Sequence, residues 1–587
     1  MKRRHFLYAA GFGTMAGLTG FNPAFARAGR TVTQICDDFL DAYVRINPTL
    51  VGKVFGLERN SSAISDWSPA GAEKAAALMR ATLAELADTP PLNRKEELGA
   101  AFLEDTARAI LAGIEAGEPY RKMSTHIFIG PPALLLTSFE QMSQGQSGDV
   151  PVSADARDRD WANILHRLEA VPTAMAGYRQ SLELGLVRNL PAPRSMTLAV
   201  AKQCSGWASQ GWFAKFAARY PGGALAGPLA AAAAKADRTY GELGQWLAQS
   251  YAPKASPEDG IGSERYLLYT DLWLGLRTLD LDEAYGWAVE EFHRLEAEKT
   301  KESGRIRAGA SFEDIRTQLD GDPKQSLAVA PFRDWAQAEV DRAIAKLGES
   351  EFDIPPQLRT CKVQMTEAGS GAMPFYVAPS EDFSTPGTVV WPTLGKTELP
   401  TWSANSTIYH ESVPGHHIQI GGSRLLDLVR LQRVAGAAGH AEGWALYAER
   451  LMDELGWFDT PQKRLGFLSM QSFRAARVFV DIGLHTGRKI PSGMEGAGQP
   501  WTAATAIPLI DRASGLGRDA AAMEVERYYG WPAQACAYKL GERVWLNCRA
   551  DAMAKAGAAF NRRKWHADAL AMGPLGLDTL KQQLAKL

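Results

Sequence analysis

Hydrophobic residues along most of this chain recur at the spacing of amphipathic α-helices. In 284–295, alanine, phenylalanine and leucine return every three or four positions with charged residues between them. Similar patterns, rich in alanine, run through 72–87, 332–347 and 228–248, the last of which begins with a proline at a favourable first helical position. The pattern predicts a mainly α protein whose helices pack closely through small side chains.

One stretch, at 361–391, interrupts the helical pattern. Residues 361–366 alternate apolar and polar, and 375–377 and 388–391 are short β-rich runs bounded by Gly and Pro. We expect a small sheet directly before the histidine-rich segment that follows. An edge strand of this sheet would hold an extended peptide by β-augmentation, or the sheet would only stabilise the fold. The sequence leaves both readings open.

The histidine-rich segment carries the most informative chemistry. His410 and Glu411 are adjacent, His416 and His417 follow within seven positions, and Glu442 comes 26 residues after His416. Two imidazoles and a carboxylate form the ligand set of many catalytic zinc sites, in which a fourth position stays open for water. A glutamate beside the first histidine then stays off the metal and acts as the general base. The segment therefore predicts a hydrolytic zinc centre.

The spacing of these histidines is irregular for a zinc-binding helix. On a regular helix His416 would lie roughly 120° around the axis from His410, and His417 would lie about 10.5 Å further along it. Pro414 has no N–H for the preceding turn, and Gly415 permits a sharp change of direction. We therefore expect the helix to break here and to bring His416 beside His410, with His417 as the alternative ligand.

The composition is that of an ordinary globular protein. The 587 residues carry 64 Lys and Arg against 66 Asp and Glu, and this formal net charge of −2 points to neither nucleic acid nor an anionic membrane as partner. The five cysteines show no paired metal spacing. No stretch is long and apolar enough for an integral membrane segment in the mature chain. Nothing in the sequence indicates the oligomeric state.

Residues 1–28 have the features of an export signal peptide of the twin-arginine type. Arg3 and Arg4 precede a mild apolar stretch rich in Gly and Ala, and a small-x-small cleavage site follows it. We expect the mature protein to be periplasmic and to form a single helical domain over 29–587, with its motifs in 400–545.

Taken together, the motifs resemble those of a known family. Residues 410–419 read H-E-S-V-P-G-H-H-I-Q and resemble the signature H-E-x-x-P-G-H-H-x-Q of the bacterial family called domain of unknown function 885. Further segments similar to that family are 442–449, 481–485 and 527–541. The order of these motifs indicates that the resemblance covers nearly all of the mature chain.

The family in turn looks similar to helical zinc peptidases typified by thimet oligopeptidase and carboxypeptidase Taq. This resemblance implies a large helical zincin-like fold with a deep channel, one zinc ion, and a small β-sheet next to the metal-binding helix. It implies that His410, His416 and Glu442 bind the metal, with His416 favoured over His417, and that Glu411 is the general base.

A late segment supplies further candidates for the site. Related helical peptidases use a tyrosine from a comparable segment to stabilise the oxyanion, which implies Tyr528 or Tyr538 in that role here. Arg527 and Arg477 are candidates for binding a substrate carboxylate through a bidentate fork, and the apolar helix that carries Arg477 also carries Arg474. His485 is a further catalytic candidate on the same wall.

These observations predict a zinc-dependent hydrolase that cleaves peptide bonds in short peptides by metal-activated water. One alternative is a non-peptide amide hydrolase on the same metal site. The other is a non-catalytic peptide-binding protein. The intact Glu411 argues against the last, because a binding module has no need of a base at that position.

Overall fold

The chain folds mainly into α-helices, which confirms the fold class that its hydrophobic pattern predicts. The computed structural model describes residues 29–54, 61–143, 154–366 and 373–587. The segment 1–28, where we expect the export signal, lies outside the described residues.

The first helices contribute one side of the main hydrophobic core. They are α1 (Val32–Ile46), α2 (Pro48–Val54), α3 (Pro69–Ala87) and α4 (Arg94–Glu115). At the start of α1, Thr31 and Gln34 form a capping box in which each side chain accepts from the other residue's backbone N–H. Helix α3 confirms the helix predicted at 72–87, and it packs against α4.

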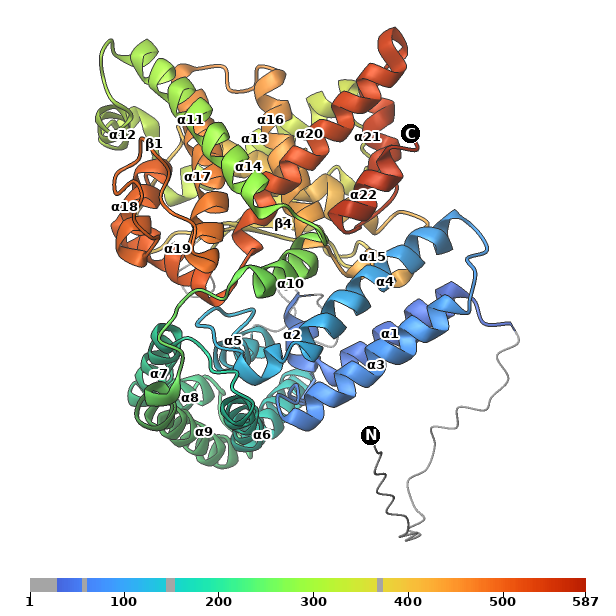
Figure 1. Ribbon diagram of the computed structural model, residues 1–587, viewed down its shortest axis with the longest axis vertical. Helices are drawn as coiled ribbons and strands as arrows, with labels where there is room; N and C mark the ends of the chain where they lie inside the picture. The colour runs from blue at the N-terminus through green and yellow to red at the C-terminus, as the bar shows by residue number, and fades with distance from the viewer. Residues whose placement is uncertain (1–28, 55–60, 144–153, 367–372) are drawn as a thin grey trace, which may run out of the picture.

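A second hydrophobic core lies within the next group of helices. They are α5 (Pro131–Ser143), α6 (Ala154–Val187), α7 (Arg194–Ser209), α8 (Trp212–Ala217) and α9 (Ala226–Trp246). The rings of Phe139, Phe213 and Phe216 pack together inside it. Figure 1 shows these helices at the lower end of the molecule, with α10 (Ser263–Leu274) between them and the later helices.

The remaining helices form the body that carries the candidate site. They are α11 (Leu281–Ile306), α12 (Phe312–Asp320), α13 (Val329–Ser350), α14 (Ala404–Glu411), α15 (Arg430–Val434), α16 (Ala438–Glu454), α17 (Pro461–Thr486), α18 (Ala503–Ser514), α19 (Arg518–Gly530), α20 (Ala537–Ala556), α21 (Arg562–Leu570) and α22 (Leu577–Leu584). Helix α11 packs along α17, and α16 packs along α20. Glycines permit the second contact, because a Cβ on Gly443 of α16 would lie 2.6 Å from the Cα of Gly541 on α20.

Two small sheets complete the described fold. Strand β1 (Ser326–Ala328) pairs antiparallel with β5 (Glu398–Pro400). The other sheet has the order β2 (Cys361–Thr366), β4 (Gly387–Pro392) and β3 (Phe375–Val377), with β4 parallel to β2 and antiparallel to β3. This sheet confirms the three predicted β-rich runs and comes directly before α14 in the chain.

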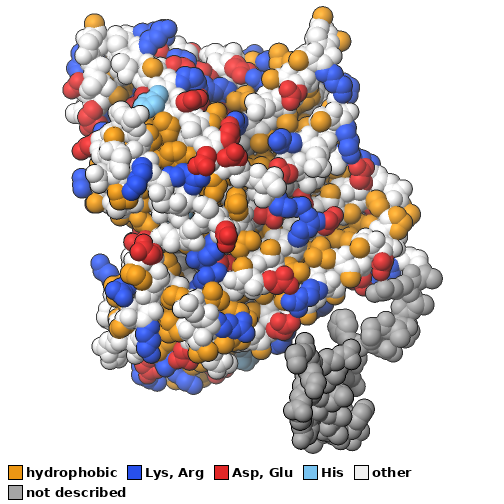
Figure 2. Space-filling model, viewed as in Figure 1, with side chains coloured by type: hydrophobic (Ala, Val, Ile, Leu, Met, Phe, Trp, Pro, Cys, Tyr) orange, Lys and Arg blue, Asp and Glu red, His pale blue; other side chains and the backbone are white. Residues whose placement is uncertain are grey.

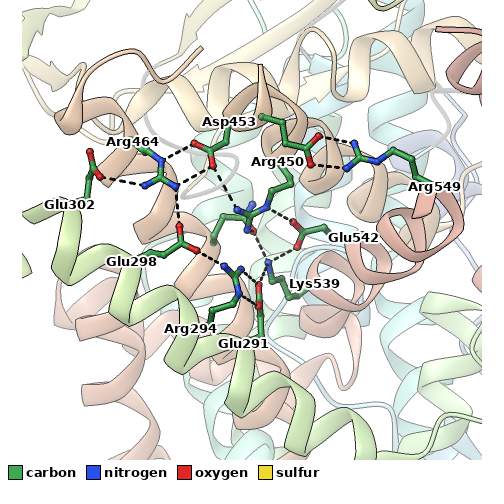
Figure 3. A network of polar contacts seen from close by, with 12 residues as sticks. Glu291, Arg294, Glu298, Glu302, Arg450, Asp453, Arg464, Lys539, Glu542 and Arg549 are labelled. Atoms are coloured by element: carbon green, nitrogen blue, oxygen red, sulfur yellow. Dashed lines mark hydrogen bonds and ion pairs between the residues drawn. The ribbon is translucent and has the colours of Figure 1, made fainter. Parts of the chain in front are cut away.

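A network of ion pairs joins α11, α16, α17 and α20 (Figure 3). At its centre the ammonium of Lys539 on α20 lies 2.5 Å from Glu542 and 3.0 Å from Glu291 on α11. Towards its edge, Arg464 on α17 pairs with Asp453 on α16 at 3.0 Å. Lys539 and Glu542 are each only 1% exposed. The four helices are therefore joined by ion pairs, several of whose charged groups contact more than one partner.

The surface agrees with the balanced composition. Figure 2 shows positive and negative side chains interspersed over the visible face. Among the helices that the structure describes, none has an apolar stretch of the length that crossing a bilayer requires.

Candidate metal centre

The chain breaks its helix where the sequence predicts. Helix α14 ends at Glu411, and the following turn contains Pro414 and Gly415. Gly415 lies against the preceding helix, because a Cβ there would be 1.9 Å from the carbonyl oxygen of His410. The turn brings His416 back to His410, with their ring centroids 4.8 Å apart. A straight helix could not make this contact.

Helix α16 supplies a carboxylate to the same point. A Glu442 oxygen lies 3.2 Å from Nε2 of His410 and 3.6 Å from Nε2 of His416. Glu411 is also close, with an oxygen 3.9 Å from Nε2 of His416. Ligand-type atoms of His410, Glu411 and His416 all lie within 4.8 Å of one another. The structure thus brings together all four residues that we expect at the metal; their roles stay predictions.

His417, the alternative ligand, is engaged elsewhere. Its Nδ1 accepts from the hydroxyl of Tyr376 on β3 at 2.9 Å, and its Nε2–H donates to the carbonyl of Leu358 at 3.0 Å. Burial lowers the pKa of His417 to about 4, so the imidazole stays neutral. Both ring nitrogens of His417 are already engaged in hydrogen bonds within the protein. This favours His416 as the metal ligand.

A second carboxylate orients His410 from its other side. The imidazole Nδ1–H of His410 donates to Glu449 at 2.7 Å, and the hydroxyl of Ser406 donates to the other oxygen of Glu449. This bond fixes a proton on Nδ1 and turns Nε2 towards the Glu442 carboxylate, to which an Nε2–H donates at 3.2 Å. Metal-binding histidines are commonly held by a carboxylate in this way.

The electrostatics of the cluster follow from its burial and its carboxylates. Burial alone would lower the pKa of His410, but Glu442 and Glu449 outweigh burial and raise this pKa to about 10. Burial alone would raise the pKa of Glu442, yet the two imidazoles lower it. Burial raises the pKa of Glu411, and the neighbouring imidazoles only partly oppose that effect.

Of the two candidate tyrosines, Tyr538 is the one beside the cluster. Its ring lies 6.1 Å from that of His410 at an interplanar angle of 23°, and the charge of Glu442 helps burial to raise its pKa. Tyr528 is fully buried, and burial and the charge of Glu524 raise its pKa well above the usual range. The geometry therefore favours Tyr538 in the role that the sequence left open.

The candidate arginines form a buried group next to Tyr538. Arg477 and Arg527 both bind Glu524 at 2.9 Å, and Arg527 also donates to Gln534. Arg477 lies 4.9 Å from the centroid of the Tyr538 ring. Arg527 is thus already well paired within the protein, whereas Arg477 reaches the ring that borders His410.

His485 belongs to a different polar cluster. Its Nε2–H donates to the carbonyl of Tyr528 at 3.0 Å, and Asp481 lies 3.8 Å away. Asp481 in turn accepts from the hydroxyl of Tyr266 and from the backbone N–H of Ala533. These contacts hold α17 to α10 and to the segment before α20; the catalytic role expected for His485 stays a prediction.

Two further residues belong to this site: Glu449, to which the sequence assigned no role, and Arg474, which lies with Arg477 on the apolar helix expected to bind a substrate carboxylate. Glu449 stands seven positions after Glu442, so both carboxylates face the same side of α16, and this spacing was the available signal. Arg474 stands three positions before Arg477 on α17 and lies 4.6 Å from the Tyr538 ring centroid. Its spacing to Arg477 places the two guanidinium groups on one face.

Fold and site together define a mainly helical protein with a buried cluster of histidines and carboxylates suited to a metal. The chain belongs to the family DUF885, described as a bacterial protein of unknown function, whose model matches residues 49–584. The family resemblance of the motif at 410–419 is thereby confirmed. The further resemblance to zinc peptidases is not tested by this match and stays a prediction.

Two solved structures share the fold. One is described as a "putative lipoprotein" from Colwellia psychrerythraea; it has 21% sequence identity and a TM-score of 0.76, over 95% of this chain and 99% of that one. The other, from Shewanella oneidensis, is described as a "putative lipoprotein of unknown function", with 17% identity and a TM-score of 0.72, over 94% and 99% of the two chains. A comparison with curated proteins gives no match. At these identities the likeness shows the fold alone.

Proposed function

We propose that this protein is a zinc-dependent hydrolase that cleaves peptide bonds in short peptides. The observation that carries the proposal is the approach of Nε2 of His410 and Nε2 of His416 to one oxygen of Glu442, at 3.2 and 3.6 Å. The turn after α14 brings His416 back to His410, which a regular helix would not do. Helix α16, more than two dozen residues further along the chain, brings Glu442 to the same point.

The donor set fits zinc. Two imidazoles and one carboxylate are ligands that zinc takes in hydrolytic sites, where they leave a position open. Nδ1 of His410 is bonded to Glu449, so Nε2 is the nitrogen that would bind a metal, which would displace its proton. The carboxylate oxygen already lies close to both Nε2 atoms, so small shifts would place all three around one ion.

Each nearby side chain has a chemical task in such a reaction. Zinc, when bound, would lower the pKa of a water molecule and polarise the carbonyl of the substrate. Glu411 would accept a proton from that water and later deliver it to the leaving amine. The phenol O–H of Tyr538 would donate to the oxygen of the carbonyl as negative charge develops there.

The finer architecture also belongs to this proposal. A zincin-like arrangement with a deep channel would give a peptide access to ligands that are only 3% exposed at His410 and 7% at His416. Two surface hollows of the described structure are lined by other residues, one around Arg430 and Arg433 and one around Arg549 and Arg562. A channel of limited width would admit short peptides and exclude folded proteins.

Export to the periplasm is part of the same proposal. It is supported by Arg3 and Arg4 in the first residues and by the shared fold with two proteins described as putative lipoproteins. Replacing both arginines by lysine is expected to leave the precursor in the cytoplasm. Unchanged export of that variant would overturn the twin-arginine route.

A digest of a peptide library, read by mass spectrometry, tests the activity. We expect cleavage by the zinc-loaded protein, loss of about 10²–10⁴-fold in turnover for Glu411→Gln, and unchanged zinc content in that variant. The matched control is Glu454→Gln, which alters a partly exposed carboxylate on α16. Cleavage of non-peptide amides alone would replace the proposed substrate class. Zinc binding without any cleavage would favour a peptide-binding protein.

A further inference from the structure

A buried arginine next to the metal cluster has no ion pair with any described residue. Arg474 is only 7% exposed, and its Nε and Nη1 atoms have no hydrogen-bond partner in the described structure. The nearby Arg477 is 3% exposed, and its Nε and Nη1 atoms are likewise without partners there. A buried guanidinium without partners is costly unless something else supplies them.

The charges around these arginines do not balance locally. Arg474, Arg477 and Arg527 lie in one buried group, and Glu524 is the carboxylate that pairs with the second and third of them. Burial and the positive charge of Arg477 lower the pKa of Arg474. These three guanidinium groups share one directly paired carboxylate, and the charges of Glu449 and Glu442 offset the excess at Arg474 only in part, since its pKa is lowered. An anion with two oxygens would match this arrangement.

The position of Arg474 relative to the metal ligands limits what that anion is. The Tyr538 ring lies 6.1 Å from the His410 ring, and the Arg474 guanidinium lies 4.6 Å from the Tyr538 ring. These two steps bound the separation between His410 and Arg474. At ~3.3–3.6 Å per extended residue, no more than about three residues of a peptide would span it.

We propose, resting on the peptidase function above, that Arg474 and Arg477 bind the free C-terminal carboxylate of the substrate. The cleaved bond then lies within about three residues of the C-terminus, and the protein is an exopeptidase of the carboxypeptidase kind. Arg474 sets this specificity, because it has no ion pair with a described residue and its Nε and Nη1 atoms have no hydrogen-bond partner there. Arg477 shares its charge between Glu524 and the substrate.

A matched pair of peptide libraries tests this specificity. An N-acetylated heptapeptide library of randomised sequence is made in two forms, one with a free C-terminal carboxylate and one with a C-terminal amide. We expect the wild-type protein to cleave the acid form about 10- to 100-fold faster, the usual value of hydrogen bonds to a charged group. Products should lack only the last one to three residues.

Variants assign the preference to the arginine. In Arg474→Met the ratio of acid to amide cleavage is expected to fall towards one, and Met fills a similar buried volume without leaving a charge. Arg512→Met is the matched control, since Arg512 is 56% exposed and pairs with the exposed Glu495; its ratio should equal that of wild type. Equal cleavage of the two libraries by the wild-type protein, or an unchanged ratio in Arg474→Met, would overturn the inference.

Binding separates this inference from the proposed function. The zinc-loaded Glu411→Gln protein is immobilised, and the peptides that it retains from each library are identified by mass spectrometry. Preferential retention of the acid form without any cleavage by wild type would mean that the carboxylate site stands and the hydrolase proposal fails. Equal cleavage of both forms would mean that the hydrolase proposal stands and the carboxylate site fails. A protein that neither cleaves nor retains the peptides would refute both proposals.

Discussion

Glu449 is predicted to control the affinity of the site for zinc although it does not reach the metal position itself. Its carboxylate accepts from Nδ1–H of His410 at 2.7 Å and from the hydroxyl of Ser406, and its side chain is only 2% exposed. Glu449→Gln keeps the size and one acceptor oxygen but removes the negative charge. The imidazole then becomes a weaker base at Nε2, which is the nitrogen expected to bind zinc.

The size of the effect follows from the geometry. Loss of a carboxylate that orients a metal-binding histidine typically lowers metal affinity 10- to 100-fold. This corresponds to about 1.4–2.8 kcal/mol of binding free energy. We expect a value in the upper part of this range, because the contact is short and buried and little water screens it.

Competition with a chromogenic chelator measures the change in zinc dissociation constant. Glu454→Gln is the control, because Glu454 lies on the same helix but pairs with Arg549 at the surface, where an ion pair is worth only about 0–1 kcal/mol. The control is expected to bind zinc as wild type does. Equal affinity of Glu449→Gln and wild type, with both proteins folded, would refute the reasoning.

Three further outcomes are expected. Tyr538→Phe should lower kcat by about 10²-fold with zinc content unchanged if its hydroxyl stabilises the oxyanion; normal turnover would exclude that role. Lys539→Met should lower the Tm by several degrees, because it removes the buried ammonium between Glu542 and Glu291, and breaking a buried ion pair costs about 3–5 kcal/mol; the exposed Lys564→Met should not, and equal Tm values would contradict this. Burial lowers the pKa of His566 to about 3, below its unfolded value of about 6.5. Stability should therefore fall as the pH drops from about 6.5, by up to ~1.4 kcal/mol per unit, and His566→Gln should flatten this dependence; parallel curves of Tm against pH would be the contrary result.

Local patterns were sufficient to predict much of the fold. The alanine-rich pattern at 72–87 lies within α3, and the alternating residues 361–366 form β2. The break after Glu411 follows from the chemistry of Pro414 and Gly415, which act on their own neighbours. Such effects depend on a few adjacent residues, so a single sequence reveals them.

The remainder of the site depends on contacts between distant segments. His416 and His417 are adjacent in sequence, and only their surroundings distinguish them. The ring nitrogens of His417 are hydrogen-bonded to Tyr376 on β3 and to the carbonyl of Leu358, three residues before β2. The location of His485 in the cluster around Asp481 was equally hidden. The sequence placed Arg474 with Arg477 on an apolar helix near the motifs, but its contact with the Tyr538 ring depends on the packing of α17 against α20. No spacing rule contains this information, because it arises from tertiary packing.

Zinc content per chain tests the central claim most directly. We expect the purified protein to bind one equivalent of zinc, and His410→Ala, His416→Ala and Glu442→Ala to lose it, while His417→Gln retains it. Elemental analysis after dialysis against a metal-free buffer gives the stoichiometry of each variant. Wild-type protein that binds no zinc after reconstitution, or zinc that is retained in His416→Ala and lost in a folded His417→Gln, would contradict the account.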